Sequence, residues 1–430
     1  MHGARAVLVL ALASGCAGGG EEPRVLEFWG LGREGEVVSE LVPEFERRHP
    51  GLRVEVQQLP WGAAHEKLLT AHVGRATPDV AQVGNTWIAE LQEIGALLRL
   101  DPLLAASRAV DSADYFSGIW DTNVLAVPEA PEGALYGVPW YVDTRVLFYR
   151  KDLLARAGFE RPPRDWSEWR AAMEGVKARG GAQEYAILFP SDEWAQPVIL
   201  GMQLGAPLIA SGSRAAFSEE RFQRAVEFYV AAFRDGLAPM VANTQVSNVY
   251  QEFARGTFAM YVTGPWNLGE FRRRVPELAG RWATAPLPAP EPGSREPGVS
   301  LAGGSSLVVF AASRRQEDAW RLVEFLSEPA QQARFYELTG DLPARRSAWA
   351  AAGLERDAVA AAFLAQLQHV RPVPKVPEWE RIAFLLAEEL EPAIRGRRDV
   401  AESLAALDGR ADRILEKRRW VLARRAGEGR

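Results

Sequence analysis

Several tryptophans of this 430-residue chain stand beside glycine, proline or acidic residues, in sequence typical of loops rather than of a packed core. Five such positions are Trp29, Trp61, Trp140, Trp194 and Trp266. An indole ring next to polar side chains suits a sugar, because a pyranose ring has apolar C–H faces and hydroxyl edges. A core position is the alternative for each ring, and the sequence leaves that choice open.

Acidic residues near these rings offer a sugar two kinds of chemistry. Asp143, Asp192 and Glu193 can accept hydrogen bonds from hydroxyls, or they can form the paired carboxylates of a glycosidase. We expect hydroxyl acceptors and no catalysis, because the sequence has no Gly-x-Ser-x-Gly, phosphate-loop or HExxH motif. A phosphate-bearing ligand would instead need a convergent cation, for which the candidates are Arg33, Arg145 and Arg371.

The scaffold for these side chains alternates between strand and helix patterns from residue 24 onward. Strands are predicted over 24–29, 53–57 and 79–83, and helices over 36–48 and 63–73. Repeated strand–helix–strand units predict a mainly parallel sheet with helices on both faces. Ligands bind beyond the carboxyl ends of such strands, which brings Trp29, Asn85 and Thr86 to one rim.

A second α/β region begins near Gly137, and the chain length by itself requires two or more domains. Two strand-like runs, 135–143 and 145–150, follow one another with no turn signal between them. We therefore expect the chain to cross between domains at 142–144. From Glu317 onward the pattern is almost wholly helical.

The amino terminus has the pattern of an export signal. A short apolar run over 6–13 follows Arg5, and Cys16 is the only cysteine of the chain. The run is too short to span a bilayer. The segment Leu12–Cys16 resembles a bacterial lipobox, which implies cleavage before Cys16 and acylation of its thiol. We expect residues 1–15 to be removed and residues 16–23 to form a flexible tether.

The composition argues against several other partners. A formal net charge of −6 makes nucleic acid an unexpected partner. A single cysteine allows no internal disulfide, and five scattered histidines make a metal or another cofactor unexpected. The basic segment 416–425 is predicted to be a solvated helix end, with a membrane or partner contact as the alternative. We expect a monomer.

Five sequence blocks carry a family resemblance. They are Thr77–Val80; Leu135–Pro139 with Leu147–Leu154; Phe253–Met260 with Gly264–Trp266; Gly303–Ser305; and Ala319–Leu326 with Thr339–Pro343. In this order they resemble the extracellular solute-binding proteins of bacterial ABC importers, specifically the maltose/maltodextrin-type (family 1) group. The resemblance spans residues 24–415, and the lipobox fits the way this family is anchored in bacteria.

The resemblance implies the type II periplasmic-binding-protein fold, an α/β fold of two lobes with the ligand in the interlobe cleft and a helical carboxyl-terminal part. Lobe 1 is expected over 24–141 and 302–327, and lobe 2 over 145–300 and 329–417, before a basic tail over 418–430. The implied function is capture of a sugar or oligosaccharide by hinge closure and its delivery to ABC permease subunits. The implied location is an exported lipoprotein, in the periplasm or on the outer face of the cytoplasmic membrane.

The resemblance also assigns ligand contacts by motif position. Trp266 and Trp379 match aromatic residues that stack on sugar rings, and Asp143 matches a hinge carboxylate that accepts hydrogen bonds from hydroxyls. The remaining matches are Trp194 with Glu193 beside it, Asn85, Thr86, and the shorter blocks at Trp61, Trp29 and Gly304. Two alternatives remain open besides a glycoside-acting enzyme: the same fold binding a glycerol phosphodiester or polyol, and an adhesive or scaffold protein without small-molecule transport.

Overall fold

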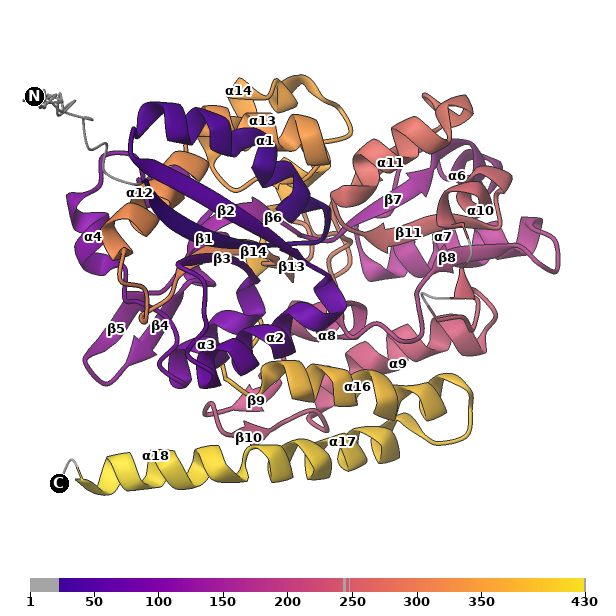
Figure 1. The fold of residues 1–430 in the computed structure, drawn as a ribbon. Helices are drawn as coiled ribbons and strands as arrows, with labels where there is room; N and C mark the ends of the chain where they lie inside the picture. Colours follow the sequence, from indigo (N-terminus) through magenta and orange to yellow (C-terminus); the bar gives the residue numbers. More distant parts are fainter. Residues whose placement is uncertain (1–22, 243–244, 247, 429–430) are drawn as a thin grey trace, which may run out of the picture.

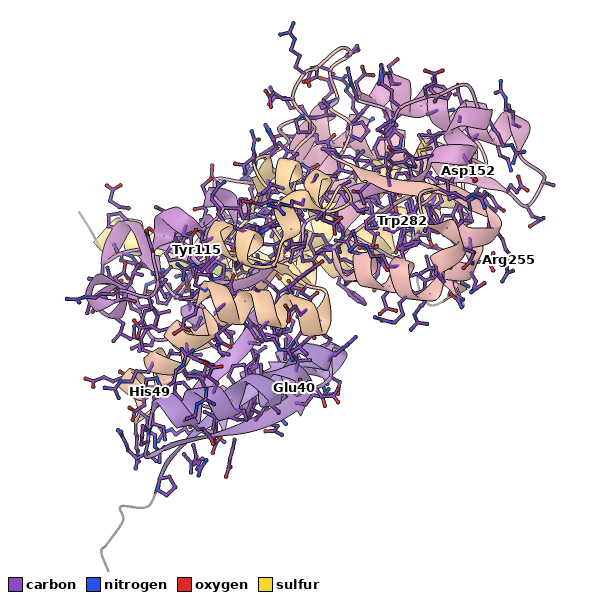
Figure 2. All side chains as sticks on the ribbon, turned by 90° about the horizontal axis from the view of Figure 1, so that it is seen from above. Glu40, His49, Tyr115, Asp152, Arg255 and Trp282 are labelled. Atoms are coloured by element: carbon purple, nitrogen blue, oxygen red, sulfur yellow. The ribbon has the colours of Figure 1, made fainter. Side chains whose placement is uncertain are left out.

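Two α/β lobes stand side by side in the computed structural model (Figure 1). The structure describes residues 23–242, 245–246 and 248–428, so Cys16, the predicted signal peptide and most of the tether lie outside it. Seen from above, Glu40 and Tyr115 lie on one lobe, and Asp152 and Trp282 lie on the other (Figure 2). In the described part of the chain, no helix is long and apolar enough to cross a membrane.

Lobe 1 is built on a six-stranded sheet with the strand order β15-β6-β14-β3-β1-β2. Its first elements are β1 (Arg24–Leu31), α1 (Gly32–Arg48), β2 (Leu52–Leu59), α2 (Trp61–Val73) and β3 (Val80–Gly84). α1 carries apolar residues at helical spacing, and Val38, Leu41 and Phe45 are buried in the lobe 1 core. β1 pairs in parallel with both β2 and β3, as the strand–helix–strand pattern predicts.

The other half of this sheet is antiparallel, so the prediction of a mainly parallel sheet is wrong. β14 (Gly304–Val309) runs antiparallel to β3 and to β6 (Val138–Val142), and β15 (Leu342–Pro343) runs antiparallel to β6. The chain leaves lobe 1 at the end of β6 and returns to it at the start of β14, which lie at the same end of the sheet. That connection forces the two strands to run in opposite directions.

Trp140 is a core residue of lobe 1. The sequence alone had not decided whether its ring contacts a ligand or packs in the core. Trp140 is fully buried, and its ring centroid lies 4.2 Å from that of Phe335. The remaining elements of this lobe are α3 (Ile88–Glu93), α4 (Asp101–Ala106), α5 (Ser117–Asp121), β4 (Val124–Val127), β5 (Ala130–Leu135), α12 (Gln316–Leu326), α13 (Pro329–Thr339) and α14 (Arg346–Ala351).

Lobe 2 contains a four-stranded mixed sheet of order β12-β7-β11-β8. The strands are β12 (Trp282–Ala285), β7 (Val146–Arg150), β11 (Phe258–Thr263) and β8 (Tyr185–Leu188). Trp169, Phe189 and Tyr229 are buried in its core. The other elements are α6 (Lys151–Arg156), α7 (Trp166–Arg179), α8 (Ala195–Gln203), β9 (Ile209–Ala210), β10 (Arg214–Ala215), α9 (Glu220–Arg234), α10 (Val249–Arg255), α11 (Trp266–Arg274), β13 (Ser300–Leu301), α15 (Ala361–Gln366) and β16 (Val370–Arg371).

Three helices at the carboxyl end extend lobe 2 (Figure 1). α16 (Trp379–Ile394) and α17 (Val400–Ile414) pack against each other and against α9, and α18 (Glu416–Glu428) follows α17. Arg418 donates a hydrogen bond to the carbonyl oxygen of Gly212 (2.7 Å), and Arg419 donates to that of Ser213 (3.0 Å). These two cations of the basic segment therefore bind the β9–β10 turn instead of being fully solvated.

The chain crosses between the lobes after β6, before β14 and again after α14. At the first two crossings, the Asp143 N–H donates to the Gly303 carbonyl oxygen at 2.9 Å, which ties the two crossing segments together. Residues 329–351 belong to lobe 1, so their predicted place in lobe 2 is wrong. The reason is tertiary, because β15 adds to the edge of the lobe 1 sheet and α13 packs against α1.

Candidate ligand-binding site

Acidic and aromatic side chains gather where lobe 1 faces the first crossing. Glu34 lies in the first turn of α1, directly beyond the carboxyl end of β1. Its carboxylate accepts hydrogen bonds from the Tyr141 hydroxyl (3.3 Å) and from Trp61 Nε1 (3.4 Å). Trp61, at the start of α2, is 39% exposed. The lobe 1 rim therefore offers a half-open indole ring beside a carboxylate.

A buried network holds Tyr141 in place. Gln82 Nε2 donates to the Tyr141 hydroxyl at 3.1 Å, and the Ser305 hydroxyl donates to it at 2.9 Å. Gln82 in turn accepts a hydrogen bond from the Leu31 N–H (2.8 Å). Three strands of the lobe 1 sheet thus orient one phenol, which presents its proton to Glu34.

Asp341 is a second carboxyl on this side of the site; it lies just before β15 and is buried. Burial, together with the nearby negative charges of Glu34 and Asp143, raises its pKa to about 8. Burial also raises the pKa of Glu34. At neutral pH the Asp341 carboxyl is therefore mostly protonated, and it can donate a hydrogen bond where an ionised carboxylate can only accept one.

A salt-bridged cluster lies between the first crossing and lobe 2. Arg145 forms an ion pair with Asp143 and another with Glu193 (3.1 Å), and its side chain is 11% exposed. Glu193 also accepts a hydrogen bond from Gln196 Nε2 at 2.9 Å. The arrangement places two carboxylates on one guanidinium, so this corner of the site has no unpaired cation.

Trp266 is the lobe 2 aromatic residue of the site. It begins α11 directly after β11, and it is 37% exposed. The Arg145 guanidinium carbon lies 4.5 Å from the centroid of its ring, which is cation–π geometry. A Cβ at Gly264 would lie 1.8 Å from the ring, so the indole can take this position only because residue 264 is glycine.

These residues together define the interlobe site: Glu34, Trp61, Tyr141, Asp143, Arg145, Glu193, Trp266 and Asp341. Another contact between the lobes lies near it. The Thr86 side chain, in the 3₁₀ turn Asn85–Trp87 of lobe 1, makes a polar contact with Glu380 of α16 that lowers the pKa of this carboxyl. Burial raises the pKa of Glu380 more than this contact lowers it.

Other predicted ligand residues have packing roles in this structure. Trp379 is 1% exposed, and its ring meets that of the half-buried Trp194 edge to face at 5.7 Å, so its predicted stacking on a sugar is corrected to a core contact. Trp29 is 7% exposed with Lys67 over its ring, which leaves no indole face for a ligand. Both rings lie in apolar surroundings that the loop-like neighbouring residues did not reveal.

The two predicted polar contacts nearest the hinge also have other partners. Asn85 is buried, and its Nδ2 donates to the Ala302 carbonyl oxygen at 2.9 Å, so its amide links lobe 1 to the second crossing. Gly304 pairs with Val142 as the first residue of β14. Neither residue presents a side chain to the interlobe site.

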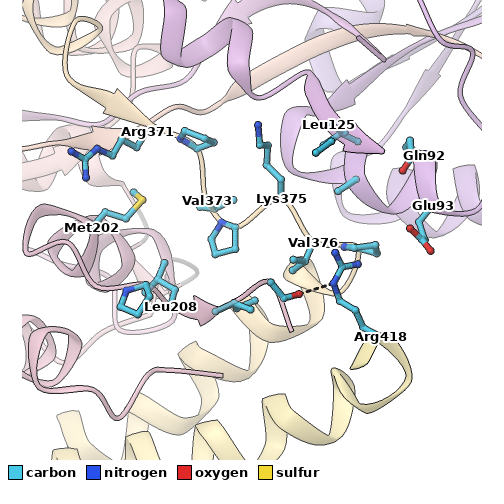
Figure 3. Close-up of a pocket in the computed structure, with 18 of the residues that line it drawn as sticks. Gln92, Glu93, Leu125, Met202, Leu208, Arg371, Val373, Lys375, Val376 and Arg418 are labelled. Atoms are coloured by element: carbon cyan, nitrogen blue, oxygen red, sulfur yellow. Dashed lines mark hydrogen bonds between the residues drawn. The ribbon is translucent and has the colours of Figure 1, made fainter. Parts of the chain in front are cut away.

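A separate pocket of about 530 Å³ lies between α3 and β4 of lobe 1 and the 202–212 and 371–377 segments of lobe 2 (Figure 3). Its wall is polar and apolar in about equal parts, and Arg418 lines one side, where it donates a hydrogen bond to the Gly212 carbonyl oxygen. The interlobe site shares no residue with this pocket. Among the described residues, no group of three or more His, Cys, Asp or Glu side chains could hold a metal.

The sequence reasoning missed Glu34, Tyr141 and Asp341. Glu34 and Asp341 carried usable signals, since Glu34 follows a predicted strand and Asp341 lies within the Thr339–Pro343 block. Arg145 was considered only as a phosphate ligand, and its two carboxylate partners depend on the fold.

Two α/β lobes with repeated crossings, and polar and aromatic side chains from both lobes gathered between them, define the class of two-lobe solute-binding proteins. The model of the family described as bacterial extracellular solute-binding protein matches residues 29–333, and the chain belongs to this family. Its expected fold and class are thereby confirmed.

Individual relatives agree with the family assignment. The structure of the sugar-binding protein MalE from the phytopathogen Xanthomonas citri is 45% identical, with a TM-score of 0.87, over 93% of this chain and 99% of that chain. A binding protein of Brucella abortus is 27% identical over 414 residues, 95% of this chain and 96% of the relative. The galactooligosaccharide-binding protein of Bacillus subtilis is 24% identical over 377 residues, 85% of this chain and 84% of the relative. These relatives are binding proteins.

Proposed function

We propose that the chain binds an uncharged saccharide at the interlobe site and delivers it to the permease of an ABC importer. The observation that carries the proposal is the pairing of two half-open indole rings with hydrogen-bonding groups from both lobes. Trp61 is 39% and Trp266 is 37% exposed. Indole faces cover the C–H patches of a pyranose, and carboxylates accept hydrogen bonds from its hydroxyls.

The charges of the site favour an uncharged ligand over a phosphodiester. Arg145 is already paired with Asp143 and Glu193, and Arg33 donates to the Leu338 carbonyl oxygen at 2.8 Å. An anionic ligand would therefore meet a cluster whose carboxylates outnumber its guanidinium. The similarity to the Xanthomonas citri sugar-binding protein and to the galactooligosaccharide-binding protein supports the same choice.

Ligand contacts from both lobes provide the driving force for closure. A ligand that touches lobe 1 and lobe 2 binds the closed arrangement better than an open one, and so shifts the equilibrium toward closure. The crossings at 143–145 and 302–303 are the hinge segments in this proposal. The closed, loaded form is the one that the permease is proposed to receive.

The test is a calorimetric titration of the purified chain with neutral mono- and oligosaccharides and with a glycerol phosphodiester, combined with small-angle scattering. We expect stoichiometric binding of a neutral saccharide, a smaller radius of gyration in the complex, and no change in the sugar after prolonged incubation. Binding of the phosphodiester alone would contradict the choice of ligand. Release of a hydrolysed product would contradict a pure binding function.

The membrane attachment is a separate part of the proposal. We expect Cys16 to carry lipid, which would hold the binding protein near its importer and raise its local concentration there. Expression of the full chain in a bacterium with labelled palmitate tests this. The label should appear in the full chain and be absent from Cys16→Ala, and a labelled Cys16→Ala chain would contradict the assignment.

A further inference from the structure

Arg145 contacts three residues of the site at once. Its guanidinium pairs with Asp143 and Glu193 and stacks on Trp266. Its side chain is 11% exposed, whereas 37% of Trp266 remains exposed. The indole therefore covers the cation on one side while part of its own surface stays open to a ligand.

The backbone of the same residue belongs to the hinge. The Arg145 N–H donates to the Ser300 hydroxyl at 3.2 Å, and that hydroxyl donates to the Arg145 carbonyl oxygen at 2.7 Å. Ser300 is fully buried in β13, on the segment that leads back to lobe 1. The main chain of Arg145 thus links the two crossing segments. Its side chain contacts Asp143, Glu193 and Trp266 of the interlobe site.

We propose that Arg145 is a positioning residue, which fixes the orientation of Trp266, Asp143 and Glu193 and couples that orientation to the hinge. This inference rests on the proposed saccharide function, because it concerns the same site. A planar guanidinium can lie flat on an indole while two of its edges bind carboxylates, and a lysine ammonium cannot do both. Substitution by lysine should therefore restore only part of the effect.

Removal of the cation has a defined physical consequence. Asp143 and Glu193 would face each other without a counter-charge, and like charges held this close repel. The Trp266 ring would lose its stacking partner and move among several orientations. When the Trp266 ring is loosely held, it must be ordered as the ligand binds, and this ordering costs free energy. We therefore expect the substitution to weaken ligand binding as well as to lower the stability of the fold.

Arg345 provides a matched control in lobe 1. Its side chain is 9% exposed, it pairs with Asp114 at 2.7 Å, and its guanidinium carbon lies 5.6 Å from the centroid of the Tyr115 ring. It therefore has the burial, the ion pair and the ring contact of Arg145 without contacting the interlobe site. A purely structural role of Arg145 predicts that the two substitutions behave alike.

The experiment compares wild type with Arg145→Met, Arg145→Lys and Arg345→Met, using maltose as the probe in calorimetry and thermal unfolding to measure stability. We expect Arg145→Met to weaken maltose binding about tenfold, which corresponds to the loss of a desolvated cation–π contact. Arg145→Lys should fall between Arg145→Met and wild type. Arg345→Met should lower the melting temperature and leave the affinity unchanged.

A second measurement needs no ligand. In chains labelled with 5-fluorotryptophan, the ¹⁹F signal of Trp266 is assigned by its absence in Trp266→Phe. We expect this signal to shift or broaden in Arg145→Met and to stay in place in Arg345→Met. If wild type does not bind maltose, the neutral saccharide that it binds in the titration above replaces maltose as the probe. If it binds none, the saccharide assignment is at fault, and the ¹⁹F result still decides the role of Arg145.

Two results would overturn the inference. One is an Arg145→Met chain that keeps wild-type maltose affinity or an unchanged Trp266 signal. The other is an Arg345→Met chain that loses affinity to the same extent, since both effects would then follow from stability alone.

Discussion

Trp266→Ala is the most direct test of the site, and its effect can be worked from the exposure of the ring. A tryptophan buries up to about 250 Å² when fully covered. The 37% of Trp266 that is exposed thus amounts to about 90 Å². At about 25 cal/mol per Å², covering that surface with a sugar contributes about 2 kcal/mol. We therefore expect a dissociation constant about 30-fold weaker in the alanine variant.

The assay is calorimetric titration with the best neutral saccharide, with circular dichroism and thermal unfolding to verify the fold. Trp420→Ala is the matched control, because Trp420 is 58% exposed on α18 and also has an arginine, Arg424, over its ring at 4.9 Å. The control should bind like wild type. A folded Trp266→Ala chain with wild-type affinity, or an equal loss in Trp420→Ala, would refute the stacking role.

Three further substitutions test the surroundings of the site. The pKa of Asp341 is raised to about 8, so its contribution to stability is full below its unfolded pKa near 4 and is lost as pH rises toward 8, by at most about 1.4 kcal/mol per pH unit. Asp341→Asn should therefore gain stability relative to wild type between pH 5 and 8 in urea unfolding, and parallel pH profiles would contradict this. A Cβ on Gly303 would lie 2.2 Å from the Asp143 carbonyl oxygen, so Gly303→Ala should cost about 1–3 kcal/mol of unfolding free energy; an unchanged urea midpoint would show that the crossing can adjust. Thr86→Val removes the hydroxyl that contacts Glu380 between the lobes and should weaken saccharide binding about fivefold, the equivalent of about 1 kcal/mol; calorimetry giving the wild-type value would argue against a role for this contact in the closed form.

Local patterns predicted the individual elements and the crossing at 142–144 well. Alternating and helical apolar periodicity depends on residues close in sequence, which is why β1, α1 and β2 could be recognised from their residues. The sequence could not show which lobe contains residues 329–351, because α13 and β15 have apolar patterns that fit either lobe. In the folded chain, β15 pairs with β6 at the edge of the six-stranded sheet, and this places the segment in lobe 1.

The same division holds for the site. The glycine–proline context of Trp266 predicted a ligand contact there, and the family resemblance implied contacts at Asp143, in the hinge, and at Glu193, beside Trp194. These predictions depend on residue type and on neighbours close in the sequence. Nothing near Trp379 in the sequence distinguished it from Trp266, yet one is 1% and the other 37% exposed. Burial is set by segments far along the chain, such as Trp194 against Trp379.

By itself, the sequence determined the class of this protein, its two α/β regions and its abundance of aromatic and acidic groups suited to a sugar. Only the tertiary structure decided which of those groups meet. Glu34, Asp143, Glu193, Trp266 and Asp341 are spread over some 300 residues, and they converge because the chain crosses between the lobes and returns. Arg145 shows this most clearly, since the fold gives its charge two carboxylates and an indole ring.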